Sequence, residues 1–375
     1  RILSDVVVAD SMGETTKADL LRKLKGFRVF GQRFTFDALI LGQLTAGEEK
    51  TTVKLPSTPT AMFVPAALGD KKARKLSEEF YRTAFKGTDD QLKLFRDLLD
   101  KVTADMGRVK DEEWFLSAAA SWLRVLGTMT GTYGEGYPLY MRGPLFALKQ
   151  IQEFLGSFTE LKHDTLLYAK QNYAELGAGG EDLKVPPVPK GFVEPNLPFW
   201  YELKRLVSYF ESGLTSEASF AAEFEQYGRM GNFKETIDFL TTLAEKELSG
   251  KKITDGEYEK LRLVQLSDMA KPFGDVVFNR EEDYYSGLVA DIHTDGVNSS
   301  ILYQGTGEPY VLLVLVGNEN SPRLTIGITY NHYEFSEPLG NRLNDQQWQE
   351  RVYHEPTKLP GKNTYYREII IGKDK

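Results

Sequence analysis

The centre of the chain reads Pro144-Leu-Phe-Ala-Leu-Lys-Gln-Ile-Gln-Glu-Phe-Leu155, and Gly156-Ser157 leads from there into Phe158-Thr-Glu-Leu-Lys-His-Asp-Thr-Leu-Leu-Tyr-Ala-Lys-Gln-Asn-Tyr-Ala-Glu-Leu176. In both runs the apolar residues recur at the spacing of one face of a helix. Pro144 suits the first turn of a helix, and Gly177 suits a helix end. The sequence therefore predicts two consecutive amphipathic helices, over residues 145–155 and 158–176.

Helical patterns continue on both sides of this centre. Thr88-Asp-Asp-Gln91 has the spacing of a capping box and precedes an apolar stripe over residues 92–102. Thr254-Asp-Gly-Glu257 opens another helix, which we expect to run to Ala270. Further helices are predicted over residues 110–129, 198–213, 217–228 and 232–248. The proline- and glycine-rich residues 177–198 between them predict an extended strap on the surface.

The pattern changes after Pro272. Short runs of β-branched and aromatic residues alternate with turn sequences such as Asp295-Gly296. They predict antiparallel strands over residues 288–292, 300–303, 310–316, 324–335 and 366–371, with a short helix over residues 344–352. The fold class we predict is α+β: a large, mainly α-helical body over residues 1–272, followed by a small antiparallel β-rich C-terminal region over residues 273–375.

Composition excludes several classes of function. The 375 residues include no cysteine and four histidines, which excludes thiol nucleophiles, disulfide frameworks and iron–sulfur clusters. The net charge of −8 argues against a nucleic-acid partner. No apolar run approaches the roughly 18 residues of a membrane-spanning helix, so none is predicted within this chain. Because the chain begins at Arg1, we expect it to be a processed piece of a longer protein.

The first candidate site lies within the second central helix. Offsets of three and four residues place Glu160, His163 and Asp164 on one helical face. Glu-x-x-His is half of a di-iron motif, but such sites need a second copy, and the helical part holds no other histidine. One interpretation is a buried hydrogen-bond network that fixes the helix. The other is part of a catalytic or metal site.

The second candidate site lies on the first predicted strand. Strand alternation would place Asp291, His293 and Asp295 on one face. Two carboxylates beside an imidazole can act as an acid–base pair or hold a divalent metal ion, with His163 as a further ligand if the helix comes close. The alternative is a solvated polar edge that leads into the Asp295-Gly296 turn.

The other histidines are weaker candidates. His332 and Glu334 alternate onto one face of the predicted 324–335 strand and could join either group, although a solvated strand face explains them as well. His354 is expected on a surface loop. Exposed aromatic residues such as Tyr284 and Tyr285 could stack on a glycan.

Five sequence blocks carry a family resemblance. In chain order they are Gly31-Gln-Arg-Phe-Thr-Phe-Asp37, residues 155–171, Gly191-Phe-Val-Glu-Pro195, Ala290-Asp-Ile-His-Thr294 and Arg342-Leu-Asn-Asp-Gln-Gln-Trp348. Together they resemble a bacterial and archaeal envelope-protein family known only as domain of unknown function number thirty-one sixty. The resemblance implies a secreted, periplasmic or cell-surface location, sometimes with a lipid anchor. It also implies that an upstream half of the precursor, or another envelope protein, is the partner.

Two functions from different classes follow. The first is a secreted or envelope protein that serves as a binding or structural surface component for a protein or a glycan. The second is an extracytoplasmic hydrolase of glycan or peptide, with or without a divalent metal ion, that uses a candidate cluster of five residues: Glu160, His163, Asp164, Asp291 and His293. The two are separated by whether these side chains converge in a cleft.

Overall fold

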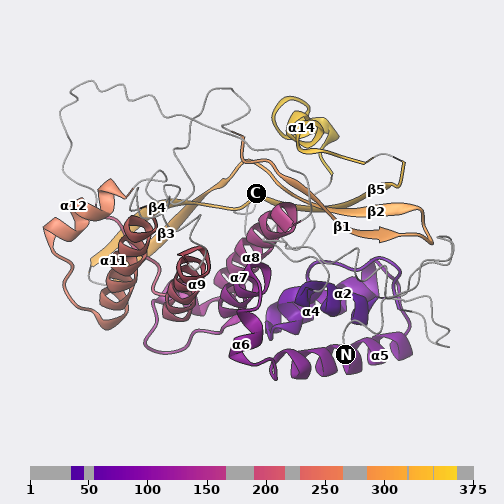
Figure 1. Cartoon of the computed structure of the whole chain (residues 1–375), viewed down its shortest axis with the longest axis horizontal. Helices are drawn as coiled ribbons and strands as arrows, with labels where there is room; N and C mark the ends of the chain where they lie inside the picture. Colours follow the sequence, from indigo (N-terminus) through magenta and orange to yellow (C-terminus); the bar gives the residue numbers. More distant parts are fainter. Residues whose placement is uncertain are drawn as a thin grey trace.

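The computed structural model describes residues 35–45, 55–165, 190–215, 229–264, 285–318, 321–340 and 342–360. Within these ranges the chain is α+β, as predicted: helices form one layer, antiparallel strands lie across it, and the short helix α14 lies on the far side of the strands (Figure 1). The predicted domain division at residue 272, the helix at 217–228 and the strand at 366–371 lie outside the described residues. None of the helices within the described ranges is both long and apolar enough to span a membrane.

From residue 88 on, the described helices follow the predicted order, and three described helices that were not predicted precede them. They are α2 Phe36–Leu44, α3 Phe63–Ala67, α4 Lys71–Thr83, α5 Asp89–Met106, α6 Asp111–Trp114, α7 Ala118–Gly127, α8 Pro144–Thr165, α9 Leu197–Thr215, α11 Arg229–Ser249, α12 Asp255–Leu263 and α14 Asp345–Gln349. Both predicted capping boxes are present, at Thr88 before α5 and at Thr254 before α12. The caps therefore start these helices where the sequence indicates.

Two helix predictions were wrong in detail. The predicted 110–129 helix is broken into α6 and α7, because the Ser117 hydroxyl caps a new helix by accepting the Ala120 N–H at 3.2 Å. The helix after Thr254 ends at Leu263, where Val264 turns to an extended conformation, rather than at Ala270.

The central prediction of two helices was also wrong, because α8 runs unbroken through Gly156. A Cβ atom at Gly156 would collide with the Tyr330 ring. This glycine therefore marks a close approach of the C-terminal region to α8 instead of a helix end.

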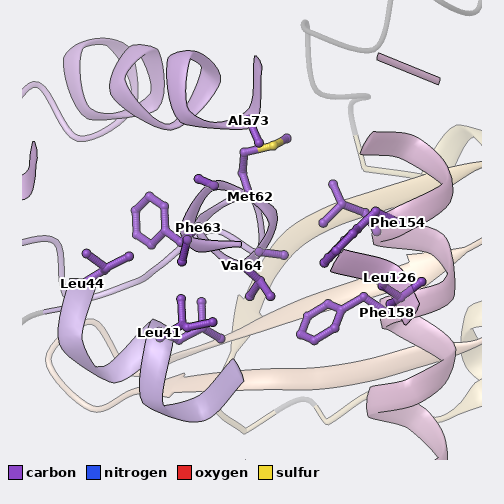
Figure 2. Close-up of a cluster of buried hydrophobic side chains, with 14 of the residues drawn as sticks. Leu41, Leu44, Met62, Phe63, Val64, Ala73, Leu126, Phe154 and Phe158 are labelled. Carbon is purple, nitrogen blue, oxygen red and sulfur yellow. The ribbon is translucent and has the colours of Figure 1, made fainter. Parts of the chain in front are cut away.

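The main hydrophobic core lies between α2, α3, α4, α5, α7 and α8. Figure 2 shows Phe154 and Phe158 of α8 pointing toward Val64 of α3, while Phe63 lies on the side of α3 away from α8, near Leu44 of α2. Because α8 carries buried aromatic residues into this core and also contacts the strands, it joins the helical layer to the β-rich region.

The described strands form two antiparallel sheets. β1 Val289–Asp295, β2 Ser300–Thr306 and β5 His332–Pro338 make a three-stranded sheet in the order β1-β2-β5. β3 Tyr310–Asn318 and β4 Ser321–Thr329 make a two-stranded ribbon. The predicted 324–335 strand is two strands in different sheets, since Tyr330 turns toward α8 and its carbonyl accepts a hydrogen bond from Gln152.

A second core joins the three-stranded sheet to α14. Trp348 of α14 is fully buried, with its ring stacked on Phe335 at 5.1 Å between ring centres. Its indole N–H donates to the Thr306 carbonyl at 2.7 Å. One face of this sheet is therefore covered by α14, and the other lies toward α8.

Candidate functional site

The first candidate group is the helix group, Glu160, His163 and Asp164 of α8. Glu160 and His163 form hydrogen bonds with residues of neighbouring elements. The Glu160 carboxylate accepts a hydrogen bond from the Tyr330 hydroxyl at 2.7 Å. His163 Nε2 lies 2.8 Å from Asp345 Oδ2, and the other oxygen of Asp345 accepts the Val289 N–H at 3.1 Å. Asp345 therefore ties α8, β1 and the first turn of α14 together. Asp164 belongs to α8, but its side chain lies outside the described part of the structure.

The second candidate group is the strand group, Asp291, His293 and Asp295 of β1, and a β-bulge separates Asp291 from His293. Asp291 is opposite Tyr303 on β2, and His293 is opposite Leu302. Because Tyr303 and Leu302 are consecutive residues and point to opposite faces of the sheet, Asp291 and His293 do not share a face, contrary to the prediction from alternation. His293 Nε2 donates to the Ser57 carbonyl at 2.9 Å, and Asp291 is paired with Arg342 at 3.3 Å on the other side.

Asp295 acts as a turn residue. Its carboxylate accepts the backbone N–H groups of Val297 and Asn298 at 2.9 and 3.0 Å and the Thr58 hydroxyl at 2.5 Å. Although burial opposes it, this set of hydrogen bonds lowers the pKa of Asp295. The carboxylate is thus fixed in its charged form at a turn.

The two candidate groups lie on adjacent elements but do not converge. Burial raises the pKa of Asp291, although nearby Arg342, His293 and Lys162 oppose the shift, and Lys162 is itself ion-paired with Asp37 at 2.9 Å. Among the side chains that the structure describes, no three His, Asp or Glu residues are grouped so that they could hold a metal ion. His163, His293 and Asp291, the expected metal ligands, each contact a different protein group.

His332 does not lie on a solvated strand face, so that interpretation was wrong. It is 4 % exposed on β5, and burial lowers its pKa to about 3, which keeps the imidazole neutral at ordinary pH. Its neighbour Glu334 accepts the Ala61 N–H at 2.7 Å and the Gln304 amide at 3.2 Å. Glu334 therefore helps to hold the sheet on the helical layer.

An ion group around the buried Lys149, which the sequence did not predict, lies at the other end of α8. Lys149 Nζ is 2.9 Å from Glu153 and 2.6 Å from Glu194. Burial raises the pKa of Glu194, because Lys149 compensates only part of the cost of desolvating two carboxylates. The group holds residues 190–196 against α8. The Lys149–Glu153 spacing was a visible signal, but Glu194 is distant in sequence.

A shallow open groove of about 440 Å³ lies beside α9, lined by Phe115, Lys204, Arg205, Ser208, Tyr209 and Ser212. Its two cations are already engaged, Lys204 with Asp238 at 2.6 Å and Arg205 with Asp111 at 3.2 Å. The Arg205 guanidinium also lies over the Phe115 ring at 4.7 Å. The groove thus offers little unpaired charge to a ligand.

The ribbon carries the most unusual surface of the described residues. Six aliphatic side chains, each 59 % to 76 % exposed, lie on one face of it as three directly opposed pairs: Val311 with Ile328, Leu313 with Ile326, and Leu315 with Leu324. We call these six residues the aliphatic face. The sequence predicts the 310–316 strand but not the exposure of one of its sides.

The opposite side of the ribbon is packed on the helical layer. Val316 is buried, and Arg323 donates to the Gly191 carbonyl at 2.9 Å while its guanidinium lies over the Phe192 and Tyr258 rings. Thr329 donates to Glu153 of α8 at 3.2 Å. The ribbon is therefore held firmly from one side, which presents the aliphatic face outward.

Comparison with known proteins identifies one family. The model for the family described as "Protein of unknown function (DUF3160)" matches residues 2–361. No curated protein and no solved structure gives a significant match.

Proposed function

Since the chain belongs to the DUF3160 family of proteins of unknown function, we propose a function from its geometry: it is a binding or structural component that works outside the cytoplasm, in the envelope or secreted, and binds a protein through the aliphatic face of the β3–β4 ribbon. The observation that carries this proposal is the exposure of six aliphatic side chains on a ribbon whose other face is anchored. An exposed apolar patch of this kind usually marks an interaction site.

The chemistry of the face favours a protein over a glycan. Glycan sites present aromatic rings and hydrogen-bonding groups, whereas the six residues are Val, Leu and Ile and offer only apolar contact. Branched aliphatic side chains on a sheet pack best against another apolar protein surface. The upstream part of a precursor, another envelope protein and a second copy of this chain all have this chemistry.

The hydrolase alternative has less support. It requires Glu160, His163, Asp291 and His293 to face one substrate, and each of these side chains already contacts its own protein group. Catalytic groups need mutual hydrogen-bond reach, directly or through one water. The geometry therefore favours the binding proposal.

The proposed location rests on the family resemblance and on composition. A chain with no cysteine folds independently of the redox state of its compartment, so an oxidising envelope suits it. Fractionation of the cells that make the protein, with protease added to intact cells, tests this. Recovery only in the cytosolic fraction would contradict it.

Photo-crosslinking tests the binding proposal. A photoreactive amino acid replaces Leu313 in the full chain, made in its own cells, and the control carries it at Val297, which is 84 % exposed at the β1–β2 turn. We expect an adduct with a second polypeptide from position 313 that is absent from position 297. The adduct must disappear when Ile326→Lys is added. No adduct above the control, or one only within the same chain, would overturn the proposal.

A further inference from the structure

The aliphatic face has the geometry of half of a two-layer sheet interface. Its three cross-strand pairs form a continuous array with no charged side chain between them. Sheets that pack face to face interdigitate such side chains at a separation of about 10 Å. The surface that would pack best on the aliphatic face is therefore another short sheet with an uncharged aliphatic face.

We propose that this cover is the same ribbon of a second copy, so that two chains form a two-fold symmetric dimer with their aliphatic faces together. This inference rests on the proposed function and names its partner. The central pair, Leu313 and Ile326, would lie nearest the symmetry axis. A self-complementary face needs no matching charges on a partner, which fits a surface made only of aliphatic residues.

Within the described ranges, the other sheet offers no comparable cover. β2 is buried along its length after its first residue. Trp348 packs against one side of that sheet, and α8 lies against the other. Within the described ranges of one chain no second exposed aliphatic sheet face remains, whereas a second copy brings an identical one.

The size of the face sets the expected affinity. At roughly 100 Å² for a fully exposed aliphatic side chain, the six side chains offer on the order of 400 Å² per copy. A standard interface buries about 800 Å² per partner. The dimer is therefore weak and concentration-dependent. Each copy carries a net charge of −8, so added salt should strengthen the association by screening the repulsion between copies.

Sedimentation equilibrium of the purified full chain tests the proposal. The variants are Leu313→Lys and Ile326→Lys on the aliphatic face, with Val297→Lys as the matched control at the β1–β2 turn, toward the other end of the molecule (Figure 1). We expect reversible dimers that tighten with salt. Each lysine on the face should raise the dissociation constant at least about tenfold, since a charge would be buried without a partner. The Val297→Lys control should behave as wild type.

Several results would overturn the inference. One is a wild-type chain that stays monomeric at every concentration and salt level, and another is equal weakening by Val297→Lys. Leu313→Ser serves as a milder variant if a lysine variant shows an altered circular dichroism spectrum or melting temperature. If the chain is monomeric but position 313 still crosslinks to a different protein, the dimer is wrong and the binding proposal stands.

Discussion

Gly156 shows how one residue can carry information about the whole fold. From the sequence it suggests a break between two helices, because glycine is a poor helix former. In the structure it lies inside α8, and the Tyr330 ring occupies the space where a Cβ atom would be. The residue pattern alone could not reveal this, since Tyr330 is far away along the chain and its approach depends on the strands.

Gly156→Ala should therefore destabilise the protein, by about 1–3 kcal/mol, because the added methyl group overpacks the contact with Tyr330. The control is Gly213→Ala in α9, where nothing lies within 4 Å of the added Cβ. That change should be neutral or slightly stabilising, as alanine is the better helix former. Urea unfolding of both variants measures the difference. Equal effects at the two glycines would contradict this account of α8.

Asp70 gives a pH-dependent prediction. It caps α4 by accepting the Ala73 N–H at 2.7 Å, and burial raises its pKa from 3.8 to about 6 despite that hydrogen bond. The folded chain then binds this proton more tightly than the unfolded chain. Protonated Asp70 therefore contributes its full stabilisation of the fold below pH 3.8, and this stabilisation is lost as the pH rises toward about 6.

Asp70→Asn keeps a good cap without the charge. At pH 7 the variant should be more stable than wild type by up to about 3 kcal/mol, and the advantage should vanish near pH 4. Unfolding free energies measured across this range check the sign. A wild-type and a variant profile that run parallel would contradict the raised pKa.

The elements were predictable where the signal is local. The capping boxes at Thr88 and Thr254 start α5 and α12, because a side chain and a backbone group three residues apart satisfy each other without any distant partner. The 324–335 run was not resolved into β4 and β5, since its change of sheet depends on Tyr330 binding to α8. Strand composition does not encode which neighbour a strand selects.

The short helix α14 holds its place through one side chain more than through its own helicity. Trp348 is fully buried and stacks on Phe335, and a Cβ atom at Gly305 would come within 2.6 Å of its ring. Trp348→Ala should cost about 3–5 kcal/mol through the cavity that it leaves. Asn344→Ala, which removes only the cap of α14, should cost about 1 kcal/mol. Thermal unfolding compares the two, and similar losses would contradict the anchoring role of Trp348.

At the scale of the whole molecule, the candidate site was predicted in part. The sequence placed Glu160 and His163 on one helix and Asp291 and His293 on one strand, and those elements do pack together. It could not show the bulge after Asp291, which divides the strand group, or Asp345 as the partner of His163. Both depend on register and long-range contacts. The exposure of the aliphatic face could not be predicted for the same reason, because an apolar strand is expected to be buried unless its neighbours are known.

The central claim is that two copies meet through the aliphatic face, and the absence of cysteine makes it directly measurable. The natural chain has no cysteine, so the Leu313→Cys variant carries a single thiol. A short bis-maleimide can therefore crosslink this thiol only to the thiol of another copy. A reagent whose reach matches the roughly 10 Å between packed sheets should give covalent dimers from Leu313→Cys and only background from Val297→Cys. Equal yields from the two positions would contradict the dimer.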